Sequence, residues 1–421
     1  MPLVIEALYI HIPFCASRCS YCAFATQATS DAALMDAYVE ALVSQLRRAS
    51  RAGLLGGVRT IYIGGGTPTH LGRRRLGSLC YAVSLSVRLE NVHEYTVEAN
   101  PESLDAPLVR DLYALGVDRF SLGVQSFDDD ILAKFGRPHT ADDARRAISA
   151  VLERTDRLSI DLICGAPGQP PSSWEAGVRE AVHLGATHVS VYPLSVEEGT
   201  PLERSVLAGR IASPDDDAQA DMMLSASRIL ADAGFHRYEI ASHALPGRES
   251  LHNTAYWTGV EYLGLGAAAA SMLSPASWQA CLDAGIFESP RAGETDTHMV
   301  TASGIDTHMV TAPAADVARI RVSARPDPAA LAAEPSCAAC DIETLDARES
   351  VLEDVMLGMR MSRGIDASLA DRAIDLVPEL PATLSKLADE GLVTSDASGT
   401  RPTERGWLLG NEIFSAIWNL A

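Results

Sequence analysis

From Ala7 to about Pro193 the chain repeats one pattern, a short apolar or β-branched run followed by a turn and an amphipathic stretch. The strand candidates are Ala7–Ile12, Thr60–Ile63, Tyr95–Glu98, Arg119–Val124, Leu158–Ile163 and His188–Tyr192. Helical patterns lie between them, for example at Asp31–Arg51, Leu108–Leu115, Asp142–Glu153 and Ser172–His183. Alternating strands and helices favour an α/β fold, a parallel sheet with right-handed crossovers. Six units are too few for an eight-stranded barrel, so the pattern predicts a partial, TIM-like (β/α)6 barrel.

The composition divides the chain into four regions. Residues 1–200 carry the barrel pattern, and residues 201–283 extend it with a helical stretch at Ala218–Ala233 and a strand at Phe235–Ile240. Residues 284–341 are rich in Ala, Asp, Thr and Pro and contain a direct repeat, so we interpret them as a low-complexity surface insertion. Residues 342–421 show helices, a turn and a short hairpin, which predicts a C-terminal α+β domain resembling a winged helix.

Bulk charge excludes several classes of partner. The formal net charge is −21 over 421 residues, so neither nucleic acid nor an anionic lipid surface is an expected partner. No window is long and apolar enough to predict stable membrane insertion. The N-terminus offers no signal-peptide pattern, and eight cysteines do not make a disulfide scaffold in a chain of this length. We therefore expect a cytoplasmic protein.

Three cysteines, Cys15, Cys19 and Cys22, lie within eight residues directly after the first predicted strand. Iron–sulfur clusters are held by thiolates, and a cubane that takes only three of them keeps one iron open to a small molecule. Zinc is the competing metal, although its short motifs are usually built from paired CxxC hooks. The remaining alternative is three buried cysteines without a ligand. The Cys337–Cys340 pair is interpreted as two thiols in a loop, with a redox or zinc half-site as the alternative.

Polar motifs follow the other predicted strands, where the reactive groups of such barrels lie. Gly64-Gly65-Gly66 follows the second strand, and glycine lets a ligand approach the backbone closely. Glu98, Gln125 and Asp161 lie in or after the next three strands, and Arg137 could fork onto a carboxylate. A ligand with an amino group, a carboxylate and ribose hydroxyls would satisfy all of them. For each acid taken singly, a structural salt bridge is the alternative.

In combination these motifs resemble a known family. The spacing CxxxCxxC resembles the radical S-adenosylmethionine (SAM) enzymes, in which SAM chelates the open iron of a [4Fe–4S] cluster. The stretches Tyr9–Cys15, Gly64–Pro68, Val97–Pro101, Ser121–Phe127 and Asp161–Gln169 are similar to the oxygen-independent coproporphyrinogen III oxidase-like proteins, which act in porphyrin biosynthesis. The likeness covers most of the chain outside the insertion and implies a barrel of the radical SAM type.

The resemblance implies a role at each matching position. Cys15, Cys19 and Cys22 would bind the cluster, with Tyr21 and Phe24 packed beside it. Tyr9, Gly65, Gly66 and Thr67 would line SAM. Glu98 would face its ammonium group, Arg137 its carboxylate, and Gln125 and Asp161 its ribose. An electron donor such as a flavodoxin or a ferredoxin is implied as a partner.

Two features separate the branches of this family. The oxidases carry a fourth cysteine two residues after the third, together with an N-terminal extension, whereas this chain has Phe24 there and begins fourteen residues before Cys15. Both features resemble the HemW-type heme chaperones, as does His252-Asn253-Thr-Ala-Tyr256-Trp257. The resemblance implies heme as a ligand, with His252 contacting it, and a heme-acceptor protein as a partner. A hydrogen-bonded structural role is the alternative for His252. One departure is the alanine-rich stretch Leu263–Ser271, which differs from the pattern of that branch.

The leading hypothesis is therefore a heme chaperone with a [4Fe–4S] cluster and SAM. The alternatives are a coproporphyrinogen III oxidase and a radical SAM enzyme with an unrelated substrate. The resemblance implies that the cluster, when supplied with an electron, could cleave SAM.

Overall fold

The computed structural model describes residues 5–288, 317–335 and 337–421. Its largest element is a twelve-stranded sheet with the order β14-β13-β12-β11-β1-β4-β5-β6-β7-β8-β10-β9. At its centre, six strands run parallel in chain order: β1 (Ala7–Ile12), β4 (Thr60–Gly65), β5 (Glu94–Ala99), β6 (Arg119–Gln125), β7 (Leu158–Cys164) and β8 (His188–Pro193). The predicted partial (β/α)6 barrel is confirmed.

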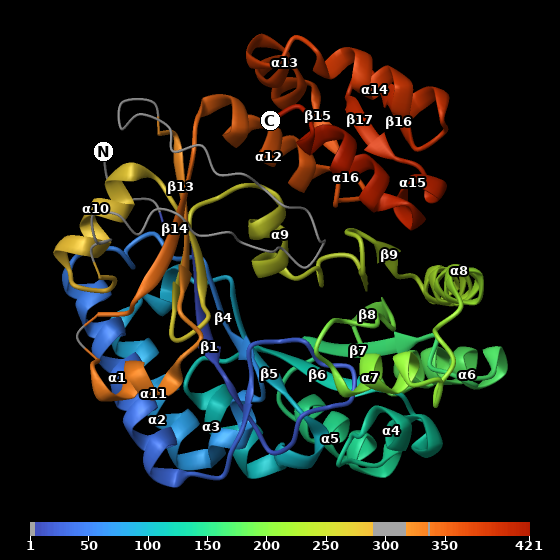
Figure 1. Cartoon of the computed structure of the whole chain (residues 1–421). Coiled ribbons are helices and arrows are strands. Elements are labelled where there is room, and N and C mark those ends of the chain that lie inside the picture. Colours follow the sequence, from blue (N-terminus) through green and yellow to red (C-terminus); the bar gives the residue numbers. More distant parts are fainter. Residues whose placement is uncertain (1–4, 289–316, 336) are drawn as a thin grey trace.

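Helices cover the outer face of these strands (Figure 1). They are α1 (Ala32–Arg51), α2 (Gly72–Ser86), α3 (Ala106–Ala114), α4 (Asp129–Phe135), α5 (Ala141–Leu152) and α6 (Pro171–His183). Helix α1 begins where the Asp31 carboxylate accepts from the amides of Ala33 and Leu34, an N-cap that satisfies otherwise unpaired donors. Its buried stripe includes Tyr38 and Leu42, which pack in the main core. In the part of the chain that the structure describes, no helix has both the length and the apolar character needed to span a bilayer.

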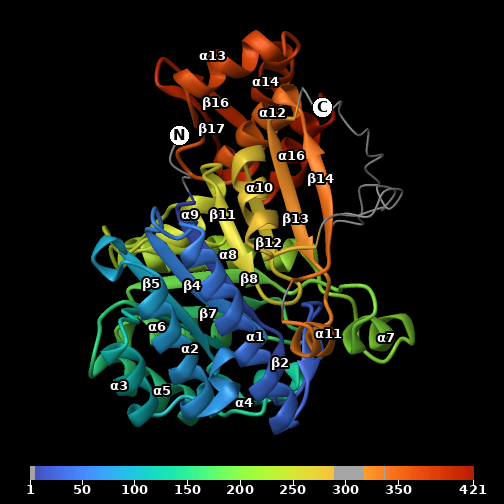
Figure 2. The same ribbon diagram turned by 90° about the vertical axis from the view of Figure 1, so that its left-hand side faces the viewer.

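Additional strands extend the sheet on both sides of the barrel. Next to β1 lies β11 (Tyr262–Leu265), which runs parallel to it and begins an antiparallel series that continues through β12 (Ala270–Leu273), β13 (Arg319–Ala324) and β14 (Cys340–Leu345). Figure 2 shows β13 and β14 beside β12, with α11 (Pro328–Ala333) near α1. Part of the range predicted to be an insertion therefore belongs to the sheet. The repeat at 296–312 lies outside the described residues.

The strand predicted at Phe235–Ile240 is wrong over most of its length, since β9 covers only His236–Arg237 and pairs with β10 (Ser242–Ala244). The backbone of the following residues serves the C-terminal domain instead. The Tyr238 carbonyl accepts from the Ser362 amide, and the Ile240 carbonyl accepts from Trp407 Nε1 at 2.6 Å. These residues are therefore held by a neighbouring domain and not by a continuous strand.

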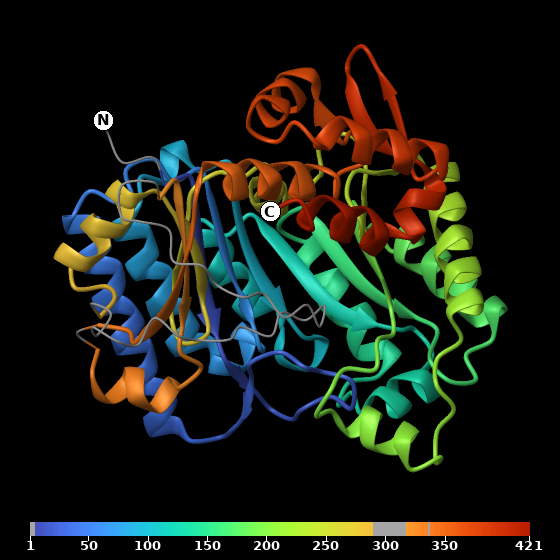
Figure 3. The same ribbon diagram turned by 45° about the horizontal axis from the view of Figure 1, so that its top comes forward.

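The C-terminal residues form a smaller domain with its own core. Its elements are α12 (Ala347–Gly358), β15 (Ile365–Asp366), α13 (Ala367–Leu376), α14 (Leu380–Asp389), β16 (Val393–Asp396), β17 (Gly399–Pro402), α15 (Glu404–Leu408) and α16 (Gly410–Trp418). The order of helix, strand, two helices and hairpin is that of a winged helix, as predicted. Figure 3 shows α12 and α16 lying beside each other, with α12 near α9 (Leu251–Trp257).

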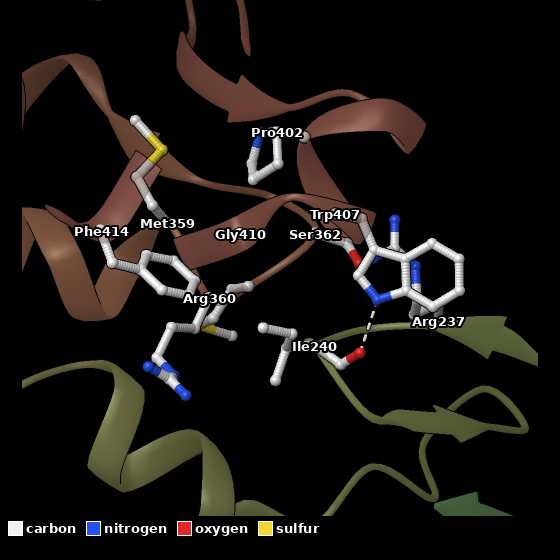
Figure 4. A pocket seen from close by; sticks show the side chains of 11 residues that line it. Arg237, Ile240, Met359, Arg360, Ser362, Pro402, Trp407, Gly410 and Phe414 are labelled. Atoms are coloured by element: carbon white, nitrogen blue, oxygen red, sulfur yellow. Dashed lines mark hydrogen bonds between the residues drawn. The ribbon is translucent and has the colours of Figure 1, made fainter. Parts of the chain in front are cut away.

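Cation–π contacts hold this domain against the barrel (Figure 4). The Arg237 guanidinium lies 4.1 Å from the ring centre of Trp407, and that of Arg360 lies 4.8 Å from the ring centre of Trp257 in α9. The gap lined by Arg237, Arg360, Trp407 and Phe414 has a volume of about 10 Å³, room for about one water molecule. This region is therefore a packed joint between domains and not a ligand pocket.

Candidate functional site

The cysteine loop leaves the sheet at the carboxyl end of β1. Its first part, β2 (Phe14–Cys15), pairs with β3 (Gln27–Ala28), so the two ends of the loop are fixed side by side. The glycine turn after β4 holds it from the other side, because the Gly66 amide donates to the Ile12 carbonyl and the Thr67 amide donates to the Phe14 carbonyl, both at 2.8 Å. The cysteines and the glycine turn are thus brought together, as predicted from their positions at strand ends.

Two of the three cysteine sulfurs accept hydrogen bonds from side chains in the loops around them. Thr67 Oγ1 lies 3.5 Å from Cys15 Sγ, and Arg137 Nη1 lies 3.3 Å from Cys19 Sγ. Burial raises the pKa of the thiols of Cys15 and Cys22, so a positively charged group is needed to favour their thiolates. Among the described residues, no three His, Cys, Asp or Glu side chains lie close enough together to bind a single metal ion. In a [4Fe–4S] cluster, by contrast, each thiolate binds a different iron atom.

The glycine turn has no room for side chains. Gly65 has a φ of +114°, and a Cβ at this position would lie 2.4 Å from Cε1 of His11. A Cβ at Gly66 would lie 2.8 Å from the Phe14 carbonyl oxygen and 3.0 Å from Cys15 Sγ. Glycine is therefore required here both for the backbone conformation and for the close approach of the cysteine loop.

Two carboxylates lie on the inner face of the sheet. Glu98 accepts hydrogen bonds from Tyr62 Oη at 2.7 Å and from the Gly65 amide at 2.9 Å. Asp161 accepts from Ser121 Oγ at 3.4 Å. Burial raises the pKa of both carboxyl groups, and the charge of Asp161 further raises the pKa of Glu98. Hydrogen bonds from neighbouring groups oppose the shift at both residues. Neither forms a direct salt bridge among the described residues, although the charge of buried Arg119 lowers the pKa of both. A cationic ligand would favour their ionised forms.

Tyr9 lies on the same inner face, at the centre of β1. Its hydroxyl and His11 Nδ1 are 2.8 Å apart, and its ring centre lies 6.3 Å from that of Tyr62. Burial raises the pKa of the Tyr9 phenol well above its usual value, so the group stays neutral near pH 7. Tyr9 is therefore a neutral hydrogen-bonding group beside Tyr62.

Arg137 is the most connected side chain of the site. Besides Cys19, its guanidinium donates from Nη2 to Asn100 Oδ1 at 2.8 Å and to the Gly123 carbonyl at 2.7 Å. Its Nε is buried and has no hydrogen-bond partner among the described residues. An unpaired buried donor on a charged group is costly, so a ligand that accepts from it would be stabilised.

Gln125 ends β6 in a backbone conformation that is unusual for its residue type, with a φ of +67°. The pairing of β6 with β7 shifts register between Leu122 and Gln125. Such strain and bulges are common at functional sites, where they aim a side chain away from the regular ladder. The geometry is consistent with the binding role expected for Gln125.

The two aromatic residues expected beside the cluster behave differently. Tyr21 packs edge-on against Phe135, with ring centres 5.2 Å apart. Phe24 lies in the cysteine loop and is 70% exposed. The structure therefore places Tyr21 in a packed environment and Phe24 at the surface of the loop.

His252 lies in α9 and is 1% exposed. Its Nδ1 is 2.9 Å from Thr60 Oγ1 and its Nε2 is 2.9 Å from Tyr256 Oη, so both ring nitrogens have partners. Burial lowers its pKa to about 3, which keeps the ring neutral. The ring also stacks on Tyr62, at 5.1 Å between centres. This arrangement favours the structural role for His252, and heme contact by this residue stays a prediction.

The support for α9 was not visible in the sequence. Glu94 is completely buried and accepts from the amides of Leu251 and His252 and from Ser250 Oγ, at 2.8–3.1 Å. Buried Arg119 lies near this carboxylate, which raises the arginine pKa against the effect of burial. A carboxylate at the first residue of β5 thus holds the start of a helix more than 150 residues away.

Two of the five cysteines outside the loop, Cys337 and Cys340, lie near Glu288. Cys337 Sγ is 3.9 Å from Glu288 Oε1, and Cys340 Sγ is 4.0 Å from the Glu288 carbonyl oxygen. Cys340 begins strand β14, so this pair is not contained in one loop as expected.

Comparison with known proteins agrees with this geometry. Residues 9–181 match the model of the radical SAM superfamily, and residues 345–409 match the HemN C-terminal domain. The chain is 31% identical to the heme chaperone HemW of Bacillus subtilis over 418 residues, covering 98% of this chain and 99% of the relative. It is 38% identical to the heme chaperone HemW of Lactococcus lactis over 273 residues, covering 64% and 70%.

A solved structure shows the same fold. The coproporphyrinogen III oxidase HemN of Escherichia coli superposes with a TM-score of 0.75 at 20% identity, covering 100% of this chain and 92% of that one. At this identity the likeness concerns the fold. Together with the full-length relative, the strand-end motifs and the C-terminal domain, it supports one assignment. The chain belongs to the radical SAM superfamily, in the HemW-type heme chaperone branch of the oxygen-independent coproporphyrinogen III oxidase-like family.

Proposed function

We propose that this protein is a cytoplasmic heme chaperone that binds a [4Fe–4S] cluster with SAM, binds heme, and passes the heme to an acceptor protein. The observation that carries the proposal is the likeness to a heme chaperone along the whole chain, including the C-terminal domain. Phe24 supports it, because the oxidases of the family would carry a cysteine there.

The residues present fit the cluster and SAM. Cys15, Cys19 and Cys22 would hold three irons, and Thr67 and Arg137 already donate toward two of the sulfurs. A bound cluster supplies an electron that can cleave SAM. The polar residues of the site would bind and orient SAM. Glu98 would accept from its ammonium group, and the unpartnered Nε of Arg137 would donate to its carboxylate. Tyr9, Gly65, Gly66, Gln125 and Asp161 would line the rest, with an external electron donor as a further partner.

We propose heme binding but assign no residue as the ligand of the heme iron. His252 would have to leave Thr60 and Tyr256 before either of its nitrogens could bind iron. Exposed Phe24 offers an apolar surface next to the cysteine loop, of the kind that suits a porphyrin face. The heme site is therefore tested directly with protein variants.

The experiment is an anaerobic comparison of two activities of the reconstituted, full-length protein. Hemin is titrated while its absorbance spectrum is followed, and coproporphyrinogen III is incubated separately with SAM and dithionite. We expect saturable binding of about one heme per chain and no protoporphyrinogen. Formation of protoporphyrinogen would instead show an oxidase. Absence of both heme binding and protoporphyrinogen formation would favour an unrelated substrate.

Variants of the same protein locate the heme. Phe24→Ser is compared with Leu207→Ser, because Leu207 is a similarly exposed apolar residue on α7 (Pro201–Leu207). Weaker heme binding in the first variant alone would place heme at the cysteine loop. His252→Ala is tested in the same titration, and a changed heme spectrum in this variant would assign His252 as a ligand.

A further inference from the structure

Three side chains form a continuous hydrogen-bonded path between two cysteines of the candidate cluster site. It runs from Cys15 Sγ to Thr67 Oγ1 at 3.5 Å, and from Thr67 Oγ1 to Asn100 Nδ2 at 3.0 Å. It continues from Asn100 Oδ1 to Arg137 Nη2 at 2.8 Å, and from Arg137 Nη1 to Cys19 Sγ at 3.3 Å. Asn100 is the central member and touches neither sulfur.

The amide of Asn100 suits this position because it both donates and accepts. Its Nδ2 donates to the Thr67 hydroxyl oxygen, which leaves the hydroxyl hydrogen free to point at Cys15. Its Oδ1 accepts from Arg137 and so fixes the plane of the guanidinium, whose other nitrogen donates to Cys19. A carboxylate or an alkyl group of the same size could not do both.

The surrounding backbone leaves space for the path. A Cβ on Gly123 would lie 2.9 Å from Asn100 Oδ1 and 3.4 Å from Arg137 Nη2. The Gly123 carbonyl also accepts from Arg137 Nη2 at 2.7 Å, so the guanidinium is held by two acceptors. Asn100 follows β5 and Gly123 lies in β6, and both strands are part of the central parallel sheet. The path is thus built on rigid elements.

We propose that Asn100 is a positioning residue that aims Thr67 and Arg137 at the cysteine sulfurs and thereby raises the reduction potential of a cluster bound there. The inference rests on the proposed cluster site. Hydrogen bonds to thiolate sulfurs stabilise the reduced, more negative state of a cluster, because they offset its additional charge. Loss of Asn100 frees the Thr67 hydroxyl and leaves Arg137 Nη2 with the Gly123 carbonyl alone, so both donors are aimed less well at the sulfurs and reduction becomes less favourable.

The test replaces Asn100 with Leu and compares it with Asn91→Leu. Asn91 is an exposed asparagine before the amino end of β5, so the same chemical change is made at the other end of one strand. Both proteins are reconstituted anaerobically, their iron and sulfide contents are measured, and the midpoint potential is determined without SAM by redox titration followed by electron paramagnetic resonance. We expect equal iron contents and a roughly tenfold shift of the reduction equilibrium toward the oxidised form in Asn100→Leu alone, which is ~59 mV for one electron.

The possible outcomes separate the inference from the function on which it rests. A wild-type protein that takes up no cluster overturns the proposed function. A wild-type cluster with an unchanged potential in Asn100→Leu overturns the inference only. If Asn100→Leu does not fold, Asn100→Ser fits the same space and is expected to shift the potential in the same direction. In a Thr67→Val protein, Asn100→Leu should shift the midpoint potential less, because Asn100 can then act only through Arg137. If the shifts of the two single variants simply add in the double variant, the path is contradicted.

Discussion

Arg137 donates a hydrogen bond to the sulfur of Cys19 across the site, at 3.3 Å between Nη1 and Sγ. The two residues are 118 positions apart, and the fold brings the cysteine loop after β1 against the end of α4, where the Ser20 amide donates to the Phe135 carbonyl. The same guanidinium keeps its Nε unpaired among the described residues. In the proposed function, this one side chain would contact the cluster ligand Cys19 and the carboxylate of SAM at the same time.

The first prediction concerns this bridge. Arg137→Lys keeps the charge but loses the planar fork, so SAM affinity should fall about tenfold to a hundredfold while the iron content is retained. The measurement is a SAM titration of the reduced cluster by electron paramagnetic resonance. Arg145→Lys, on the exposed side of α5, is the control and should leave the affinity unchanged. Equal affinities in both variants would remove Arg137 from the SAM site.

The glycine turn yields a prediction about stability. Gly65→Ala should lower the free energy of unfolding by roughly 2–4 kcal/mol, because alanine is strained at this φ and its Cβ meets the His11 ring. Gly77→Ala is the matched control, since no atom lies within 4 Å of its Cβ position in α2, and it should stabilise by about 1 kcal/mol. Urea denaturation measures both. A Gly65→Ala protein as stable as the wild type would show that the turn can relax.

At position 125, glycine should give a more stable protein than alanine, which is the reverse of the usual order within a strand. Because its φ is +67°, Gln125→Gly is expected to be about 1 kcal/mol more stable than Gln125→Ala. At Thr394, in the exposed β16, alanine should instead be the more stable of the two. Thermal and urea unfolding of the four variants decides the question, and the same order at both sites would argue against strain at Gln125.

Glu98 should make stability depend on pH. Its pKa is raised in the folded protein, mainly by burial, so the neutral form is favoured and its stabilising effect is lost as the pH rises above about 4.5. Glu98→Gln should therefore gain stability relative to the wild type as the pH rises from 4.5 to 7.5, by roughly 1.4 kcal/mol for each unit by which the pKa is raised. The free energy of unfolding is measured in urea across this range. Glu90→Gln, which changes an exposed residue before the same strand, should show no such trend.

His252 should destabilise the protein in acid. Its pKa is lowered from 6.5 to about 3 by burial, so protonation in the unfolded state is favoured as the pH falls from 6.5 toward 3 and stability is lost. His252→Ala should be roughly 2–4 kcal/mol less stable at pH 7, yet lose less stability on acidification. The exposed His93→Ala is the control. Parallel loss in His252→Ala and wild type would place the acid sensitivity elsewhere.

Much of the barrel was predictable from sequence, because strands such as β1 and β7 are short apolar runs whose conformation is dictated locally. Strand β14 was missed because it lies after the compositionally biased stretch that hid the continuation of the sheet. The segment Tyr238–Ile240 was misassigned because its backbone partners come from the C-terminal domain, which no local pattern reveals.

In the candidate site, too, some residues could be recognised from the sequence and others could not. The three cysteines and the glycine turn were recognisable because each forms a short motif at a strand end. The positioning role inferred for Asn100 was not recognisable, although the residue lies within a conspicuous motif, because its partners Thr67 and Arg137 are 33 and 37 positions away. Glu94 was missed for the same reason, since the helix that it holds begins 156 residues later at Ser250. Such contacts depend on strand order and register.

The place of β1 in the sheet has a consequence for synthesis of the protein. This strand, which leads into the cysteine loop, pairs with β4 on one side and with β11 on the other. During translation its first edge can be covered early, but its second edge stays open until Leu265 has left the ribosome. The cysteine loop is thus made well before the second strand that supports β1. Iron that bound before that point would bind while the sheet was incomplete and one edge of β1 was still unpaired.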